Sequence, residues 1–339
     1  MSDVLLATKL HIPPLHRNLV RRPRLIQRLN EGLSPDRRLM LISAPAGYGK
    51  STLLSDWASQ VSLPVAWLSL GAEENTPGRF WTYFVTALTN LPALHQAACC
   101  ETVLQGLQYP HPTPMEAALT SLMNELSQVK EESILVLDDL HNITDKQIHL
   151  DLVFLINALP RSGSCLHLVA ASRMDPPWPL ARWRGRGELS ELRSADLRFS
   201  SPEAAHFLDQ VFQLKLSAQE ISALQERIEG WIVGLQMAAV SMQGKWKSQG
   251  APGVANFIAT LSGSNRFILD YLMDEVITQQ PAEMRDFLQA TAILEQFTAP
   301  LCDALLGRQD SQALLDLVEQ ANLFLIPLDD ERQWYRYHH

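Results

Sequence analysis

The chain has 339 residues, of which 46% are hydrophobic and 19% charged, and its formal net charge is -9 at pH 7. This composition excludes a disordered polypeptide, because it supplies enough apolar residues for the cores of two or three domains. The acidic balance argues against a broad nucleic-acid surface, and no run of about 20 apolar residues predicts a membrane-spanning helix. We therefore expect a cytoplasmic protein that binds neither DNA nor a membrane directly.

The first half of the chain alternates short apolar runs with longer helical stretches, which is typical of a parallel sheet flanked by helices. The runs are almost continuously apolar, as expected for strands that are covered on both faces. They span residues 39–43, 65–70, 134–137 and 166–171, and a fifth short strand is expected among Leu189, Leu192 and Phe199. These features predict an α/β domain over residues 1–199, including an N-terminal lead segment.

A phosphate-binding motif follows the first predicted strand. Residues 44–51 are Ala-Pro-Ala-Gly-Tyr-Gly-Lys-Ser, and a helix is predicted from Thr52 to Gln60. A strand, a glycine-bearing loop and a helix in this order are the context that a P-loop requires. Gly47 and Gly49 allow the backbone to wrap closely around a phosphate, and the start of the helix adds its positive dipole end.

The residue types of this loop predict an ATP site. The positive charge of Lys50 is expected at the β- and γ-phosphates, and the Ser51 hydroxyl is expected to bind Mg²⁺. The first motif position is Ala44 instead of glycine, which a small residue can fill if its φ is negative. The predicted nucleotide-binding residues of the loop are Ala46, Gly47, Tyr48, Gly49, Lys50, Ser51 and Thr52.

Two adjacent carboxylates end the third predicted strand, Asp138 and Asp139. Burying adjacent acids is costly unless a cation or hydrogen-bond donors lie nearby, and Mg²⁺ beside a phosphate loop supplies that compensation. We predict that Asp138 binds hydrated Mg²⁺ and that Asp139 orients or deprotonates the attacking water. In the alternative interpretation, the two acids only cap the next turn, together with His141 and Asn142.

Arg173 follows the fourth predicted strand, on the same rim of the sheet. From this position its guanidinium is expected to sense the γ-phosphate. With Lys50 and Asp139 it completes the predicted catalytic set. A surface salt bridge is the alternative role for an arginine at a strand end.

After the α/β half the pattern becomes helical. Ser200, Pro202 and Glu203 have the positions of a helix cap, a first-turn proline and an acid that meets the helix dipole. Residues 244–263 are richer in Gly, Ser and Pro, and we interpret them as a linker that packs in part. A helical domain with its linker is therefore predicted over residues 200–262.

The last part of the chain combines helices with a short hairpin. Amphipathic helices are predicted over residues 266–278, 282–292 and 312–320, and short strands over residues 324–328 and 334–338. Several helices followed by a hairpin predict a winged-helix domain, which we place at residues 263–339.

Short motifs are distributed in a fixed order along nearly the whole chain. They lie at residues 8–10 and 13–14, 22–25, 44–53, 67–70, 79–80, 137–141, 171–173 and 176–177, 191–199, 230–231 and 234–236, and 335–338. In these motifs the sequence resembles the STAND class of signal-transducing ATPases and, within it, the MalT-like (large LuxR-type) bacterial transcription activators.

The resemblance implies three domains that close over ADP or ATP, with a shut ADP form and an ATP form that self-associates. It implies that Val20 and Arg22 line the adenine side. It also implies that the imidazole of His338 touches the β-phosphate in the closed state. A solvated strand-end histidine is the alternative, and His339 is a competing candidate.

One motif departs from the pattern of related ATPases. Residues 234–236 are Gly-Leu-Gln where those ATPases have Gly-x-Pro, so the contact of the helical domain with adenine is the weakest part of the resemblance. Trp231 and Met237 are interpreted as core residues of that helix in preference to ligand contacts.

We therefore interpret the chain as the ATP- and ADP-binding switch module of a bacterial transcriptional activator, a weak ATPase in which slow hydrolysis resets an oligomerising ATP state. Members of this family continue into a helical-repeat sensor and a helix-turn-helix that bind inducer and DNA, so a truncated regulator or an excised module is expected. One alternative is a P-loop enzyme, a kinase or nucleic-acid motor, that couples ATP hydrolysis to a second substrate. Another is an assembly scaffold that holds nucleotide without hydrolysing it.

Overall fold

The computed structural model of the chain describes residues 5–16, 18–94, 103, 115–159, 165–261 and 265–338. The chain separates into two compact units. The first unit consists of Met1–Leu15, Arg21–Ser43 and Lys50–Arg193, and the second of His16–Val20, Ala44–Gly49 and Ser194–His339. The phosphate loop therefore groups with the second unit up to Gly49, and with the first unit from Lys50 onward.

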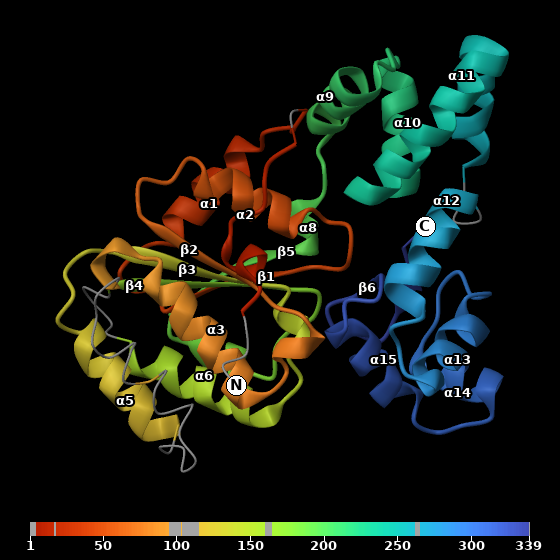
Figure 1. The fold of residues 1–339 in the computed structure, drawn as a ribbon. Helices are drawn as coiled ribbons and strands as arrows, with labels where there is room; N and C mark the ends of the chain where they lie inside the picture. Colours follow the sequence, from red (N-terminus) through yellow and green to blue (C-terminus); the bar gives the residue numbers. More distant parts are fainter. Residues whose placement is uncertain are drawn as a thin grey trace. The chain divides into compact units, whose positions relative to one another are not determined.

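The first unit is built on a five-stranded parallel sheet with helices on both faces (Figure 1). The strand order is β2-β3-β4-β1-β5. The strands are β1 Leu39–Ser43, β2 Val65–Ser69, β3 Ser133–Asp138, β4 Leu166–Ser172 and β5 Leu189–Arg193. This arrangement confirms the predicted α/β fold and all five strands, although Phe199 lies beyond β5.

The central strands are apolar because both of their faces are covered. Every residue of β1, β3 and β4 is buried. In Figure 1, α1 and α2 lie on one side of the sheet, and α3, α5 and α6 on the other. The helical segments of this unit are η1 Ala7–Leu10, α1 Pro23–Glu31, α2 Lys50–Ala58, η2 Ala72–Glu74, α3 Pro77–Thr89, η3 Pro92–Leu94, α5 Met115–Leu126, η4 Leu140–Asn142, α6 Lys146–Ala158 and α7 Leu180–Gly185.

The strand order fixes where the polar residues gather. β4 lies between β3 and β1, so the carboxyl ends of these three parallel strands are adjacent. Ser43 pairs with Ser172 in register, and Leu137 pairs with Ala170. Ligands of open α/β sheets bind outside the carboxyl ends of the strands. The segments after β3 and β4 therefore begin at the edge where such a site is expected.

The second unit is mainly helical. A capping box begins α9, because Ser200 Oγ accepts from the amide of Glu203 at 3.4 Å and Glu203 Oε2 accepts from the amide of Ser200 at 2.8 Å. The helix start predicted from these residues is thus confirmed. The helices are α8 Ser194–Leu197, α9 Ser201–Phe212, α10 Ala218–Ile228, α11 Ile232–Thr260, α12 Arg266–Leu272, a π-helical turn η5 Met273–Ile277, α13 Ala282–Thr291, α14 Ala299–Leu306 and α15 Ser311–Gln320.

The linker predicted over residues 244–263 is wrong as far as the structure describes it, because α11 continues through it to Thr260. The helix is interrupted at one residue, Gly250, with φ 64° and ψ -157°. Pro252 follows two residues later. It has no backbone N–H, and directly after the kink no helical hydrogen bond is lost by its absence. Composition indicated a linker, but the segment forms two helical pieces joined at a glycine kink.

The winged-helix part has its own core. A two-stranded antiparallel hairpin, β6 Leu325–Pro327 and β7 Tyr335–Tyr337, packs with the last helices. Phe297 and Tyr335 exchange two backbone hydrogen bonds of 2.9 Å, and both side chains are fully buried. None of the helices in the described part of the chain has the length and apolar character needed to cross a bilayer.

Candidate nucleotide-binding site

The phosphate loop has the backbone conformation that its glycines allow. Gly47 has φ 79° and Gly49 φ 73°, in the left-handed region that other residues rarely adopt. Ala44 is absent from the described residues with positive φ, so the missing first glycine causes no backbone strain. The expectation that an alanine can replace this glycine if its φ is negative is therefore met.

Two residues at the start of α2 lie close to the carboxylate that ends β3. Ser51 Oγ donates a hydrogen bond to Asp138 Oδ1 at 3.0 Å. The backbone amide of Asp139 donates to the same oxygen at 3.1 Å. Lys50 and Asp138 are 7% and 3% exposed. Ser51 and Asp138 are thus in contact, and Lys50 lies near enough for its charge to lower the pKa of Asp138, so the structure brings the three predicted residues together.

The electrostatics of this cluster result from burial. Burial raises the pKa of Asp138 to about 6, and the neighbouring charge of Asp139 raises it further, against hydrogen bonds from Ser51 and the Asp139 amide and the charge of Lys50. Burial also lowers the pKa of Lys50 to about 8, despite the charge of Asp139. Both groups are thus destabilised in their charged forms, as expected where a bound ion or phosphate normally completes the charge balance.

Asp139 occupies a strained backbone position. Its φ is 57° and ψ 39°, and its side chain makes no cap hydrogen bond to η4. Non-glycine residues in this region cost about 1–3 kcal/mol and cluster at functional sites. The side chain of Asp139 is 43% exposed, so unlike Asp138 it faces solvent. Because the side chain of Asp139 makes no cap hydrogen bond, the alternative in which both acids cap the next turn is not met at this residue, and its role toward water stays a prediction.

His141 belongs to the same cluster, and the sequence assigned it only a capping role. Its Nδ1 lies 3.8 Å from Asp139 Oδ1. Burial lowers the pKa of His141 to about 3, with further lowering by the charges of Arg173 and Lys50. The imidazole is therefore neutral near pH 7. The charge of Arg173 lowers the pKa of both Lys50 and His141, so its guanidinium lies near these two residues, and its role toward the γ-phosphate stays a prediction.

The donor set fits a hard divalent cation. Within the described residues no group of three or more His, Cys, Asp or Glu side chains forms a metal site by itself. Ser51 and Asp138 offer two oxygens that already lie 3.0 Å apart. Mg²⁺ typically takes one or two protein oxygens and completes its shell with water and phosphate. This pair matches that mode, in which the nucleotide itself supplies ligands.

The other loop residues lie in the second unit. Trp231 Nε1 donates to the carbonyl of Ala46 at 3.0 Å, and the amide of Val233 donates to the carbonyl of Gly47 at 3.2 Å. Tyr48 is buried, and burial raises its pKa to about 12. The sequence interpreted Trp231 as a core residue, and no local signal indicates that its indole bonds the loop.

The remaining predicted nucleotide contacts are Val20, Arg22, Thr52 and His338. Val20 and Arg22 are buried, in the second and first unit respectively, and Thr52 is exposed. The ring of His338 lies 3.8 Å from a Glu229 oxygen and 6.1 Å from the Phe324 ring. The roles of these residues toward nucleotide remain predictions. The competing candidate, His339, lies outside the described residues.

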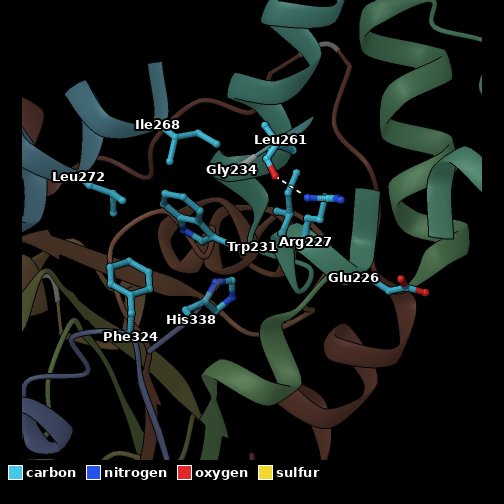
Figure 2. A pocket seen from close by; sticks show the side chains of 10 residues that line it. Glu226, Arg227, Trp231, Gly234, Leu261, Ile268, Leu272, Phe324 and His338 are labelled. Carbon is cyan, nitrogen blue, oxygen red and sulfur yellow. Dashed lines mark hydrogen bonds between the residues drawn. The ribbon is translucent and has the colours of Figure 1, made fainter. Parts of the chain in front are cut away.

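His338 also lines a cavity of about 480 Å³ within the second unit (Figure 2). Figure 2 shows the indole of Trp231 at the centre of this group, with the side chain of Arg227 hydrogen-bonded to the carbonyl of Leu261 at 2.8 Å. The lining is mostly apolar and aromatic. It consists of Glu226, Arg227, Ile228, Trp231, Gly234, Leu261, Ile268, Leu272, Phe324 and His338.

Known proteins match this chain over almost its whole length. The AAA ATPase domain matches residues 18–169, and the MalT winged helix domain matches residues 273–339. HTH-type transcriptional regulators MalT of Yersinia enterocolitica and Serratia proteamaculans are 34% and 33% identical over 335 residues, which are 99% of this chain. The chain spans 36% of the length of these relatives.

A solved structure supports the fold. The Walker-type ATPase PABY2304 of Pyrococcus abyssi has a TM-score of 0.60 and 16% identity, and the match covers 96% of this chain and 95% of that chain. At this identity the likeness concerns the fold alone. The chain is therefore a homologue of the MalT-like regulators. It has a nucleotide-binding AAA ATPase domain, followed by a MalT winged helix domain.

Proposed function

We propose that the chain is the nucleotide-dependent switch of a MalT-like transcriptional regulator, in which ADP and ATP favour different arrangements of its domains. The observation that carries this proposal is the cluster in which Lys50 and Ser51, at the end of the phosphate loop, lie beside the buried carboxylate of Asp138. A kinase or nucleic-acid motor is not favoured, because the relatives are named as transcriptional regulators.

In the proposed site the loop amides of Ala46, Gly47, Tyr48 and Gly49 hold the phosphates, and Lys50 neutralises the β- and γ-phosphate charge. Mg²⁺ would be held by Ser51 and Asp138, and it would shield the charge of the phosphate oxygens. The exposed carboxylate of Asp139 orients or deprotonates water, and Arg173 stabilises the charge that develops on the γ-phosphate. Hydrolysis is slow and resets the switch.

We also propose roles for residues outside the loop and bounds for the domains. Val20 and Arg22 line the adenine, Thr52 extends the phosphate site, and His338 contacts the β-phosphate in the closed form. The three domains span residues 1–199, 200–262 and 263–339. The ATP form self-associates in the cytoplasm, and inducer and DNA are bound by other parts of the regulator.

Thermal unfolding with nucleotide tests the proposal. The wild-type chain, stripped of nucleotide, should be stabilised by ADP and by ATP with Mg²⁺, by about 2.7 kcal/mol at 100 times the dissociation constant. Lys50→Ala should lose most of this stabilisation, because the ammonium that faces the phosphates is gone. Lys146→Ala, a change at an exposed lysine of the same unit, should retain it. Absence of adenine nucleotide binding to folded wild-type protein would contradict the proposal.

A further inference from the structure

Two consecutive carbonyls of the phosphate loop are bonded by the start of α11, all within the second unit. The carbonyl of Ala46 accepts from Trp231 Nε1 at 3.0 Å, and that of Gly47 accepts from the amide of Val233 at 3.2 Å. Trp231 is 4% exposed, so the hydrogen bond of its indole is shielded from competing water. A loop that binds phosphate is thus attached to a helix far away in sequence.

These bonds determine which way the loop amides point. In a planar trans peptide the carbonyl and the N–H of one unit point in opposite directions. Because the Ala46 and Gly47 carbonyls face α11, the N–H groups of Gly47 and Tyr48 face away from it. Inward-facing amides are what a phosphate nest requires. The start of α11 therefore holds the loop in an orientation suited to bind phosphate.

The contact is also close enough to require glycine. A Cβ at Gly47 would lie 2.7 Å from Trp231 Nε1 and 2.8 Å from Val233 Cβ, well inside normal contact distance. Gly47 is therefore needed for the approach of α11 as well as for its positive φ. The motif glycine serves the interface with the helix in addition to the phosphate.

The same indole contacts the residues that follow α11. Its ring centroid lies 5.7 Å from that of Tyr271 and 5.5 Å from that of Phe324, and Trp231 forms a wall of the 480 Å³ cavity. Trp231 Nε1 thus bonds the loop, while its ring packs against Tyr271 and Phe324. Figure 2 shows Phe324 on the same side of the cavity as the indole. A shift of either partner has to move the indole or break one of these contacts.

We propose that Trp231 is a positioning residue of the phosphate loop, which orients the Gly47 and Tyr48 amides and couples phosphate binding to the packing of the winged-helix part. This inference rests on the proposed nucleotide-binding function. By thermodynamic reciprocity, phosphate that favours this loop orientation also favours the packing of Trp231 against Tyr271 and Phe324.

Trp231→Phe tests the inference, because it removes the indole N–H and keeps an aromatic ring at the contact with Tyr271 and Phe324. Dissociation constants of ADP and AMP are measured by calorimetry on the full chain. ADP affinity should fall about 2- to 10-fold, the weight of one hydrogen bond. AMP affinity should change less, because the loop surrounds the β-phosphate. The ratio of the two affinities separates positioning of the loop from a general loss of structure.

Trp183→Phe is the matched control, since Trp183 Nε1 also donates one hydrogen bond, to Asn157 at 3.1 Å in the first unit. An unchanged ADP-to-AMP ratio in Trp231→Phe, or an equal change in Trp183→Phe, would overturn the inference while wild-type ADP binding keeps the proposed function. If Trp231→Phe does not fold, Trp231→Leu, which also lacks the indole N–H, replaces it. It should lower the same ratio, and an unchanged ratio again overturns the inference.

Discussion

At the scale of single residues, burial decides the charge of the site. Asp138 is enclosed at the end of β3, and its pKa is raised to about 6, mainly by burial and then by Asp139. Lys50 is enclosed at the start of α2, and its pKa is lowered to about 8 for the same main reason. Burial therefore disfavours the charged form of both the acid and the base. Such costs are characteristic of binding sites, where a ligand removes them.

The raised pKa of Asp138 predicts a pH-dependent stability. Below the unfolded pKa of 3.8 the carboxyl is neutral in both states, whereas above about 6 it is charged in both. The unfolding free energy should thus decrease as pH rises through this window, by up to about 3 kcal/mol at about 1.36 kcal/mol per pH unit. Asp138→Asn cannot ionise and should escape this loss.

Denaturant unfolding between pH 4 and pH 8, with chelator and without nucleotide, measures the effect. The stability of Asp138→Asn relative to wild type should increase up to about pH 6 and then stay constant. Asp36→Asn, which makes the same change at an exposed position of the same unit, is the control substitution. A constant difference for Asp138→Asn would contradict the proposed cost of burying this charge.

At the scale of elements, the junction between α10 and α11 is held by one carboxylate. Glu229 ends α10 with φ 50° and accepts a hydrogen bond from Arg336 of β7 at 2.7 Å. Arg198, after α8, lies 3.2 Å from its other oxygen, and His338 lies 3.8 Å away. Burial favours the neutral acid, but the Arg336 hydrogen bond and the charges of His338, Arg336 and Arg198 lower the pKa of Glu229 below its ordinary value.

We predict that Glu229→Gln destabilises the second unit by about 1–3 kcal/mol at neutral pH, because the two arginines lose their buried anion. A lowered pKa stabilises the fold above the unfolded value of 4.5, and this contribution disappears as pH falls through the folded value. The difference between variant and wild type in denaturant unfolding should therefore shrink in acid. Glu226→Gln, at an exposed position on the same helix, should have little effect. A loss for Glu229→Gln that persists at low pH would indicate altered packing instead of a lost charge.

At the scale of the whole molecule, a switch requires that each nucleotide binds one arrangement better than the other. We therefore predict that small-angle scattering in solution differs between the ADP form and the form with a non-hydrolysable ATP analogue and Mg²⁺. Lys50→Ala should give the same profile under both conditions. Identical wild-type profiles at saturating nucleotide would contradict the switch.

The sequence by itself determined the sheet and the chemistry of the loop. Strands that are buried on both faces are continuous apolar runs, and a P-loop needs Gly47, Gly49, Lys50 and Ser51 at fixed spacing. Both features can be recognised because each depends only on residues that are close together in the sequence. The capped start of α9 and the closing hairpin were predictable for the same reason. Separate roles for the two acids were also predicted from the sequence, and these roles stay predictions. The structure shows that Asp138 is buried, whereas the side chain of Asp139 is 43% exposed.

Tertiary structure alone decided what depends on partners far away in the chain. The glycine and serine content of residues 244–263 predicted a linker, but α11 continues there. The prediction failed because tertiary packing outweighs the weak helix propensity of single residues. Trp231 looks like any apolar core residue in sequence, and its bond to Ala46 spans 185 positions. Likewise the neutral state of His141 and the ion pairs of Glu229 arise from burial and from charges on other elements. Local patterns specify secondary structure and motifs, whereas such contacts exist only once the chain has folded.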